Sequence, residues 1–262
     1  PKNGKPAAFM GSYPWIAASD GDFDLTGYRR PMSYWREIVW GGGGHKPYIA
    51  VHRMQNYGKD MYVSKWNLTD AVRCWSWPGW EGKPTAIEVY SDAEEAELLV
   101  NGRSLGRKRV GNDFKQFYCR WDTVYEPGEV VAVAYIGGQE VGRDLLQTAG
   151  ASGLVLKADR TALRAGSDEL CFLEIELRDR RGVLDAAAEA VVRVQTEGPI
   201  VLAGCGSADP CTAERYQDPE HKLYEGRVLA ILRAGREPGK ASVTVTSPGR
   251  EDARIELEIT GA

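Results

Sequence analysis

The sequence lacks the features that mark nucleic-acid-binding, membrane-spanning and exported proteins. It carries 33 lysine and arginine residues against 37 aspartate and glutamate residues, a net charge of −4, so no excess of positive charge is available to neutralise phosphates. No apolar run approaches the about 20 residues that a membrane helix requires. The amino terminus also lacks the charged and then apolar pattern of a signal peptide. We therefore expect no nucleic acid and no membrane as a partner.

Cysteine and histidine are scarce, and their spacing fits no metal site. The five cysteines include no Cys-x-x-Cys pair, and their odd number favours free thiols in a reducing, cytoplasmic compartment. A disulfide between Cys205 and Cys211 is the alternative. The three histidines, His45, His52 and His221, match no zinc-ligand spacing. We expect no metal site and no cofactor.

Aromatic residues are nearly absent from the end of the chain and crowded at its start. Residues 151–262 contain only Phe172, Tyr216 and Tyr224, whereas seven of the eight tryptophans precede residue 91. The length of 262 residues suits two or three domains. We divide the chain into residues 1–76, 77–149 and 150–262.

Residues 1–76 do not have the pattern of a complete domain. Pro31 suits the first turn of a helix, and the glycines at 41–44 end it. The apolar residues between them recur at helical spacing, namely Tyr34, Trp35, Ile38 and Val39. A strand over 48–52 follows, but one short helix and one strand cannot bury a core of their own.

The other two segments have the patterns of β-sandwiches. Asn101-Gly102 and Gly137-Gly138 each separate two apolar-rich runs, which predicts hairpins over 96–110 and 130–146. Residues 150–153 are small and predict a linker. About seven short strands over 154–262 then favour an immunoglobulin-like sandwich, although the cysteine pair and tryptophan of antibody domains are absent.

One motif matches the nucleophile elbow of serine hydrolases. Residues 102–106 read Gly-x-Ser-x-Gly, which would make Ser104 the nucleophile. That motif requires a strand, a sharp turn and a helix, whereas Ser104 directly follows the predicted hairpin turn. We therefore interpret it as a turn followed by a returning strand.

An aspartate-rich loop resembles the start of a calcium site. Asp20, Asp22 and Asp24 alternate as in an EF-hand, but Leu25 and Pro31 occupy the positions that need glycine and glutamate. We expect these carboxylates to be solvated, to cap turns, or to line a binding site.

Three tryptophans close together, Trp75, Trp77 and Trp80, leave two interpretations open. Tryptophan buries a large area, so they could join two domains. Alternating rings on a strand would instead point the same way and form a platform that stacks on sugars. The second interpretation predicts a carbohydrate-binding or adhesive β-sandwich module.

Several stretches carry a resemblance to a known family. Residues 14–41, PWIAASDGDFDLTGYRRPMSYWREIVWG, resemble the end of the catalytic barrel in β-galactosidase-like members of glycoside hydrolase family 2, and KPYIAVH at 46–52 continues the similarity. Residues 75–108 resemble the first accessory domain after the barrel. VLAGCGSADP, YEGRVLAILRAG and PGKASVTVTSPG resemble its carboxy-terminal immunoglobulin-like domain.

This resemblance implies a mainly β fold, with two immunoglobulin-like β-sandwiches after a short α-helical remnant of a TIM barrel. It implies retaining hydrolysis of β-linked saccharides by the parent enzyme, with two catalytic glutamates on barrel strands that precede Pro1. No Asn-Glu pair of the kind that carries the family's acid/base occurs here, so we assign no catalytic residue. The accessory domains would pack on the protein's own barrel, and a homo-oligomer is compatible with this role.

The resemblance also suggests substrate contacts in the loop after the last barrel strand. Active sites of such barrels lie at the carboxyl ends of the strands, where this loop belongs. We predict that Trp15 stacks on a sugar ring and that Asp20 and Asp22 accept hydrogen bonds from sugar hydroxyls.

Overall fold

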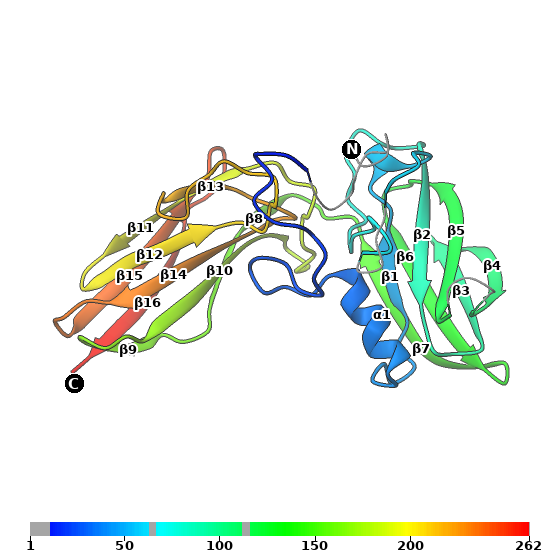
Figure 1. Cartoon of the computed structure of the whole chain (residues 1–262), viewed down its shortest axis with the longest axis horizontal. Helices are drawn as coiled ribbons and strands as arrows, with labels where there is room; N and C mark the ends of the chain where they lie inside the picture. The colour runs from blue at the N-terminus through cyan, green and yellow to red at the C-terminus, as the bar shows by residue number, and fades with distance from the viewer. Residues whose placement is uncertain (1–10, 63–66, 112–115, 262) are drawn as a thin grey trace. The chain divides into compact units, whose positions relative to one another are not determined.

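The computed structural model describes residues 11–62, 67–111 and 116–261, and the chain divides into two compact units. The first unit ends at Thr148 and the second begins at Ala149, beside the predicted linker. Both units are built mainly of antiparallel strands (Figure 1), which confirms the predicted fold class. Within the described residues no helix has the length and apolar character needed to cross a membrane.

The first unit contains two facing sheets. The three-stranded sheet has the order β1-β2-β5, and the four-stranded sheet has the order β4-β3-β6-β7. The strands are β1 (Tyr48–Val51), β2 (Pro84–Tyr90), β3 (Glu95–Val100), β4 (Arg103–Arg109), β5 (Tyr118–Val124), β6 (Glu129–Ile136) and β7 (Gln139–Gln147). The two predicted hairpins are confirmed: Asn101 and Gly102 have φ angles of 50° and 77° between β3 and β4, and the Gly137-Gly138 turn joins β6 to β7. These positive angles suit a tight turn between twisted strands.

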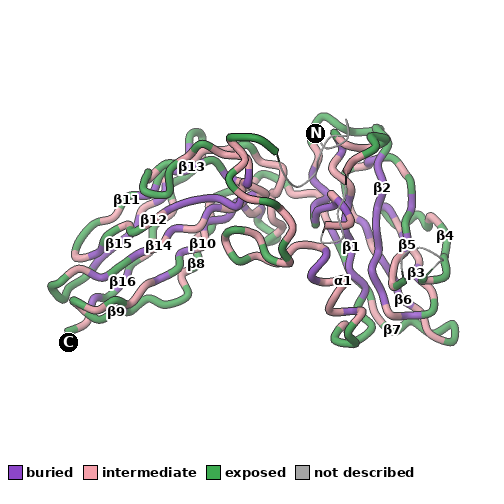
Figure 2. The backbone as a smooth tube through the Cα atoms, viewed as in Figure 1, coloured by how far each residue is buried: buried purple, intermediate pink, exposed green. Residues whose placement is uncertain are grey.

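A third layer covers the outer face of the β1-β2-β5 sheet. One face of this sheet packs against β3, β6 and β7 through side chains such as Ile87 and Trp121. The opposite face carries Tyr48 and Tyr90 and packs against Ile38 of the helix α1 (Pro31–Val39) and against Ala71. Because both faces are covered, β1 and β2 are buried almost throughout (Figure 2) and show no alternation of apolar and polar positions.

Helix α1 begins and ends where the sequence predicts. Pro31 occupies its first turn, where a missing backbone donor leaves no bond unmade. At the other end Gly41, with a φ of 79°, donates its N–H to the carbonyl of Ile38, and Gly42 donates to that of Glu37. These two bonds form a Schellman cap and satisfy carbonyl groups that the helix itself leaves free.

The first sandwich includes residues that the sequence places ahead of it. The predicted strand over 48–52 is β1, and it pairs with β2 from Tyr48↔Tyr90 to Val51↔Ile87. Trp75 and the short 3-10 helix η1 (Met54–Asn56) contribute side chains to the same core. β1, η1 and Trp75 therefore pack in the first sandwich, and the assignment of residues 1–76 to the end of a barrel stays a prediction.

The second unit is a sandwich of a four-stranded and a five-stranded sheet. Their orders are β12-β14-β10-β8 and β13-β11-β15-β16-β9. The strands are β8 (Ser152–Ala158), β9 (Ala162–Arg164), β10 (Leu170–Asp179), β11 (Val191–Glu197), β12 (Ile200–Gly206), β13 (Glu220–Lys222), β14 (Arg227–Ala234), β15 (Gly239–Thr246) and β16 (Ala253–Thr260). One apolar core lies between the sheets, around Leu173, Leu232 and Val243.

The five cysteines are free thiols. Four are buried and Cys211 is half-buried, so the alternative of a Cys205–Cys211 disulfide was wrong. Burial raises the pKa of Cys119 and Cys171 to about 11 and that of Cys205 to about 12. These three thiols are therefore protonated and unreactive at neutral pH.

Candidate functional site

The loop that carries the predicted sugar contacts is attached to α1. The carboxylate of Asp22 forms an ion pair with Arg36 of the helix, and its backbone carbonyl accepts the N–H of Arg30 at 2.8 Å. Asp22 thus already has a partner for its charge. Asp20 and Trp15 are half-buried, and the Trp15 ring lies so close to Gly11 that a Cβ there would overlap with it.

Asp24 has a structural role in the same loop. Its Oδ1 accepts the N–H of Thr26 at 2.8 Å, the hydroxyl of Thr26 at 2.9 Å and the N–H of Tyr28 at 3.0 Å. These bonds close the turn between Phe23 and Arg29, which form a single β-bridge. Within the described residues no group of acidic, histidine or cysteine side chains could hold a metal ion.

The same part of the chain exposes several large apolar side chains. Tyr13 and Trp40 are 81% and 79% exposed, the highest values among the exposed large hydrophobic residues of the described chain. Phe23, Ile16 and Leu25 are also exposed. Five such residues within one short stretch are unusual for a surface that faces only water, because clustered apolar surface marks an interaction site.

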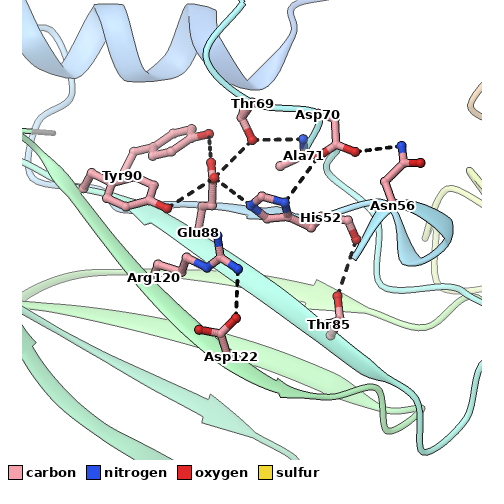
Figure 3. Close-up of polar contacts among 11 residues, drawn as sticks. His52, Asn56, Thr69, Asp70, Ala71, Thr85, Glu88, Tyr90, Arg120 and Asp122 are labelled. Atoms are coloured by element: carbon pink, nitrogen blue, oxygen red, sulfur yellow. Dashed lines mark hydrogen bonds and ion pairs between the residues drawn. The ribbon is translucent and has the colours of Figure 1, made fainter. Parts of the chain in front are cut away.

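A dense polar cluster lies on the outer face of the β1-β2-β5 sheet, around His52 (Figure 3). His52 directly follows β1, and its backbone N–H donates to the carbonyl of Ala86 at 2.9 Å. Its ring lies between two carboxylates: Nε2 is 2.8 Å from Oε1 of Glu88, and Nδ1 is 3.2 Å from Oδ1 of Asp70. The side chains of Glu88 and Asp70 are only 2% and 6% exposed.

Glu88 is the centre of this cluster. It stands in the middle of β2 and accepts hydrogen bonds from the hydroxyls of Tyr90 at 2.6 Å, Thr69 at 3.1 Å and Tyr118 at 3.3 Å. Asp70 in turn accepts the amide N–H of Asn56 at 2.8 Å. A buried carboxylate needs such donors, because burying it without them costs stability on the order of several kcal/mol.

The arrangement shifts the pKa of the ring. Burial lowers the pKa of His52, but its hydrogen bonds to Asp70 and Glu88 and their negative charges outweigh burial and raise it from 6.5 to about 9. Burial similarly acts to raise the pKa of Asp70, but the hydrogen bonds from His52 and Asn56 lower it overall. At neutral pH the cluster therefore holds an imidazolium that donates from both nitrogens.

This chemistry is that of a structural ion cluster. A ring that donates from both nitrogens has no lone pair with which to take a proton or bind a metal. The sequence analysis found no ligand spacing around His52 and missed the cluster itself. A glutamate in the centre of an otherwise apolar strand, residues 86–90, was the signal that could have revealed it, because a buried carboxylate requires a cation or several donors.

The tryptophans do not form a sugar-binding platform. Residues 75–80 contain no strand. Trp75 is 1% exposed, its ring meets that of Tyr125 edge-on at 4.9 Å, and its Nε1 donates to the carbonyl of Glu126 at 3.0 Å. Trp77 packs partly against the same core, and only Trp80 is exposed. The interpretation of three rings on one platform was therefore wrong, and Trp75 instead belongs to the core of the sandwich.

Ser104 lies on the exposed strand β4, as the hairpin prediction requires. Its hydroxyl donates to Oε1 of Glu97 at 2.6 Å. Among the described residues, the next element after β4 is the strand β5. The structural context of a nucleophile elbow is therefore missing.

Comparison with known proteins agrees with this architecture. Residues 154–256 match the model of the glycoside hydrolase family 2 C-terminal domain 5, and residues 82–142 match a domain of unknown function, DUF4982. The chain is 30% identical over 255 residues to the β-galactosidase BoGH2A of Bacteroides ovatus, covering 94% of this chain and 28% of that protein. It is 27% identical to a putative β-glucuronidase of Formosa agariphila, covering 93% of this chain and 22% of that protein.

A solved structure shows the same arrangement of strands. A glycosyl hydrolase family 2 member from Bacteroides cellulosilyticus superposes with a TM-score of 0.85 at 32% identity, over 95% of this chain and 32% of that one. The chain thus spans less than a third of the length of the curated relatives it matches. The matches to family models, sequences and structures together support a carboxy-terminal fragment of a glycoside hydrolase family 2 protein.

Proposed function

We propose that this chain is the non-catalytic carboxy-terminal part of a retaining β-glycosidase of the β-galactosidase type. The stretch ahead of β1 completes a catalytic barrel, and the two sandwiches support it. Both catalytic glutamates then lie in the barrel, outside this chain. The relatives support this proposal by their names, β-galactosidase and putative β-glucuronidase, and by lengths that exceed the matched part severalfold.

The exposed apolar side chains of residues 13–40 carry the proposal. Tyr13, Phe23 and Trp40 are more than half exposed although they belong to one short stretch. One face of α1 is already buried within the first unit, because Ile38 packs on Tyr48 and Tyr90. A further packed domain over this stretch would remove the apolar surface from water, at about 25 cal/mol for each Å² covered.

Two proteins test the proposal: this chain alone, and the longer protein that contains it. We expect the longer protein to hydrolyse an aryl β-galactoside or β-glucuronide and this chain alone to be inactive. Hydrolysis by the chain alone, or a longer protein without activity on any aryl β-glycoside, would contradict the proposal.

A second experiment tests the predicted substrate loop in the longer protein. Replacing Trp15 by alanine should raise the KM, because the indole would no longer stack on a sugar. Trp80→Ala, on the exposed turn of the first sandwich, is the matched control and should leave the KM unchanged. Equal kinetics for the Trp15 variant and the parent would remove Trp15 from the substrate site.

A further inference from the structure

Hydrogen bonds attach both ends of the connection between β1 and β2 to the sheet. It leaves the sheet after His52 and returns at Val72, whose N–H and C=O bond those of Val51 at 2.8 Å each. Between these points, Asn56 and Asp70 share a hydrogen bond of 2.8 Å, and Thr69 donates to Glu88 at 3.1 Å. The returning residues 69–72 thus contact the sheet through the backbone of Val72 and through the side chains of Thr69 and Asp70, which belong to the His52 cluster.

The His52 ring contacts both sides of this attachment. Asp70 belongs to the returning residues and Glu88 belongs to β2, so each ring nitrogen contacts a different side. If the ring loses one proton, only one nitrogen can still donate, and one buried carboxylate then loses the hydrogen bond that the ring supplied. The two carboxylates would also repel each other without a cation between them.

Other charged and titratable groups surround the two carboxylates, namely Tyr48, Arg53, Tyr90, Tyr118, Arg120 and Asp122. Arg53 acts on Asp70 and Arg120 acts on Glu88, whereas the His52 ring contacts both carboxylates. Burial and the nearby Glu88 raise the pKa of Tyr90 and Tyr118, so they stay protonated in mild alkali. Arg120 forms an ion pair with Asp122 at 2.9 Å (Figure 3).

We propose that protonated His52 is a latch that holds residues 69–72 on the β1-β2-β5 sheet, and that this segment opens locally when the ring loses its proton in mildly alkaline solution. The latch is distinct from any glycosidase activity of the longer protein and is a property of this chain. It makes the attachment of the segment that leads to Trp75 dependent on pH.

Amide hydrogen exchange across a range of pH measures this opening. The Val72 amide, bonded to Val51, and the Ala71 amide, bonded to Thr69 Oγ1 at 3.1 Å, report on the segment. If the ring has a pKa of about 9 when closed and 6.5 when open, the opening constant rises about tenfold per pH unit between these values, after correction for intrinsic exchange. The total rise is then about 300-fold, and the amide of Leu98 in β3 stays unchanged.

Two histidine variants separate the latch from general effects of alkali. His52→Gln keeps a donor but has no titrating proton, so its opening constant should be independent of pH from 6.5 to 9. His45→Asn is the matched control: His45 pairs with Asp92 at 3.0 Å, its side chain is half exposed, and asparagine tolerates its φ of 62°. This control should keep the slope of the parent chain.

The ring itself gives a second measurement that needs no variant. NMR shifts of the His52 nitrogens should show an imidazolium at pH 7.5. A neutral ring at that pH, a flat opening constant in the parent chain, or the same slope in His52→Gln would each overturn the proposal. A parallel rise at Leu98 would also overturn it, because the whole unit would then be opening.

Discussion

The two sheets of the first unit are joined at one edge by a buried ion pair, and its removal should be costly. Arg73 donates to both carboxylate oxygens of Asp144, at 2.6 and 2.8 Å. Asp144 stands on β7 and also accepts the N–H of Ile49 on β1 at 3.0 Å, so one carboxylate binds groups from both sheets. Its side chain is 4% exposed, and the Arg73 guanidinium stacks over Tyr48 at 4.8 Å.

The expected size of the effect follows from this geometry. Asp144→Asn retains an acceptor for Ile49 but leaves the partly buried Arg73 without a counter-charge. Breaking a buried pair in this way costs about 3–5 kcal/mol, and the 35% exposure of Arg73 favours the lower end, about 3 kcal/mol. Removing both charges, with Arg73→Met and Asp144→Asn together, should recover most of that loss, because no unpaired charge remains.

Urea unfolding followed by tryptophan fluorescence measures this effect in one unit only. All eight tryptophans precede Ala149, so fluorescence reports the first unit, while circular dichroism reports the strands of both. The circular dichroism transition of the second unit is the internal control and should not move. A loss below about 1 kcal/mol for Asp144→Asn, or a double variant as unstable as the single one, would refute the reasoning.

Three further predictions concern the same chain. Trp75→Ala should destabilise the first unit by about 3–5 kcal/mol, because it leaves a large cavity. Trp80→Ala, on the exposed turn, should change the stability by no more than about 0.5 kcal/mol. Equal losses of stability for the two variants in urea unfolding would contradict the burial of Trp75. A thiol reagent should modify only Cys211 in the folded chain and five cysteines after denaturation, since the other four are buried; rapid reaction at a second cysteine would count against the burial. The pKa of His52 in the folded chain is raised from 6.5 to about 9, so its contribution to the stability of the first unit is complete below pH 6.5 and is lost as pH rises through 9. The free energy of unfolding of the first unit should therefore fall by about 3 kcal/mol over that window. An unchanged free energy of unfolding in urea titrations at pH 6.5 and 9.5 would exclude the ion cluster.

The hairpins and the helix could be predicted because their signals are local. Asn101-Gly102 adopts positive φ angles at little cost, and the same chemistry places Gly41 at the end of α1. Three strands were missed. β9 and β13 have only three residues each, and β12 has a bulge between Leu202 and Gly204 that breaks its alternation.

The candidate sites could be predicted less well. The role of Asp22 as a sugar contact stays a prediction, but the sequence analysis did not foresee that its carboxylate pairs with Arg36. It weighed Trp75 as part of a platform, and the structure buries it. In both cases the partner lies elsewhere in the chain, and residue type alone does not say which partner a carboxylate or an indole finds.

Residue chemistry along the chain was enough to set the turns, the ends of α1, the mainly β character and the resemblance to glycoside hydrolase family 2. These depend on backbone angles, missing donors and short motifs, all of which are properties of neighbouring residues. Tertiary structure alone decided that β1 belongs to the first sandwich, that a third layer covers its sheet, and that His52, Asp70 and Glu88 meet there. Strand pairing and the burial of charge depend on groups distant in sequence, and only the folded chain brings them together.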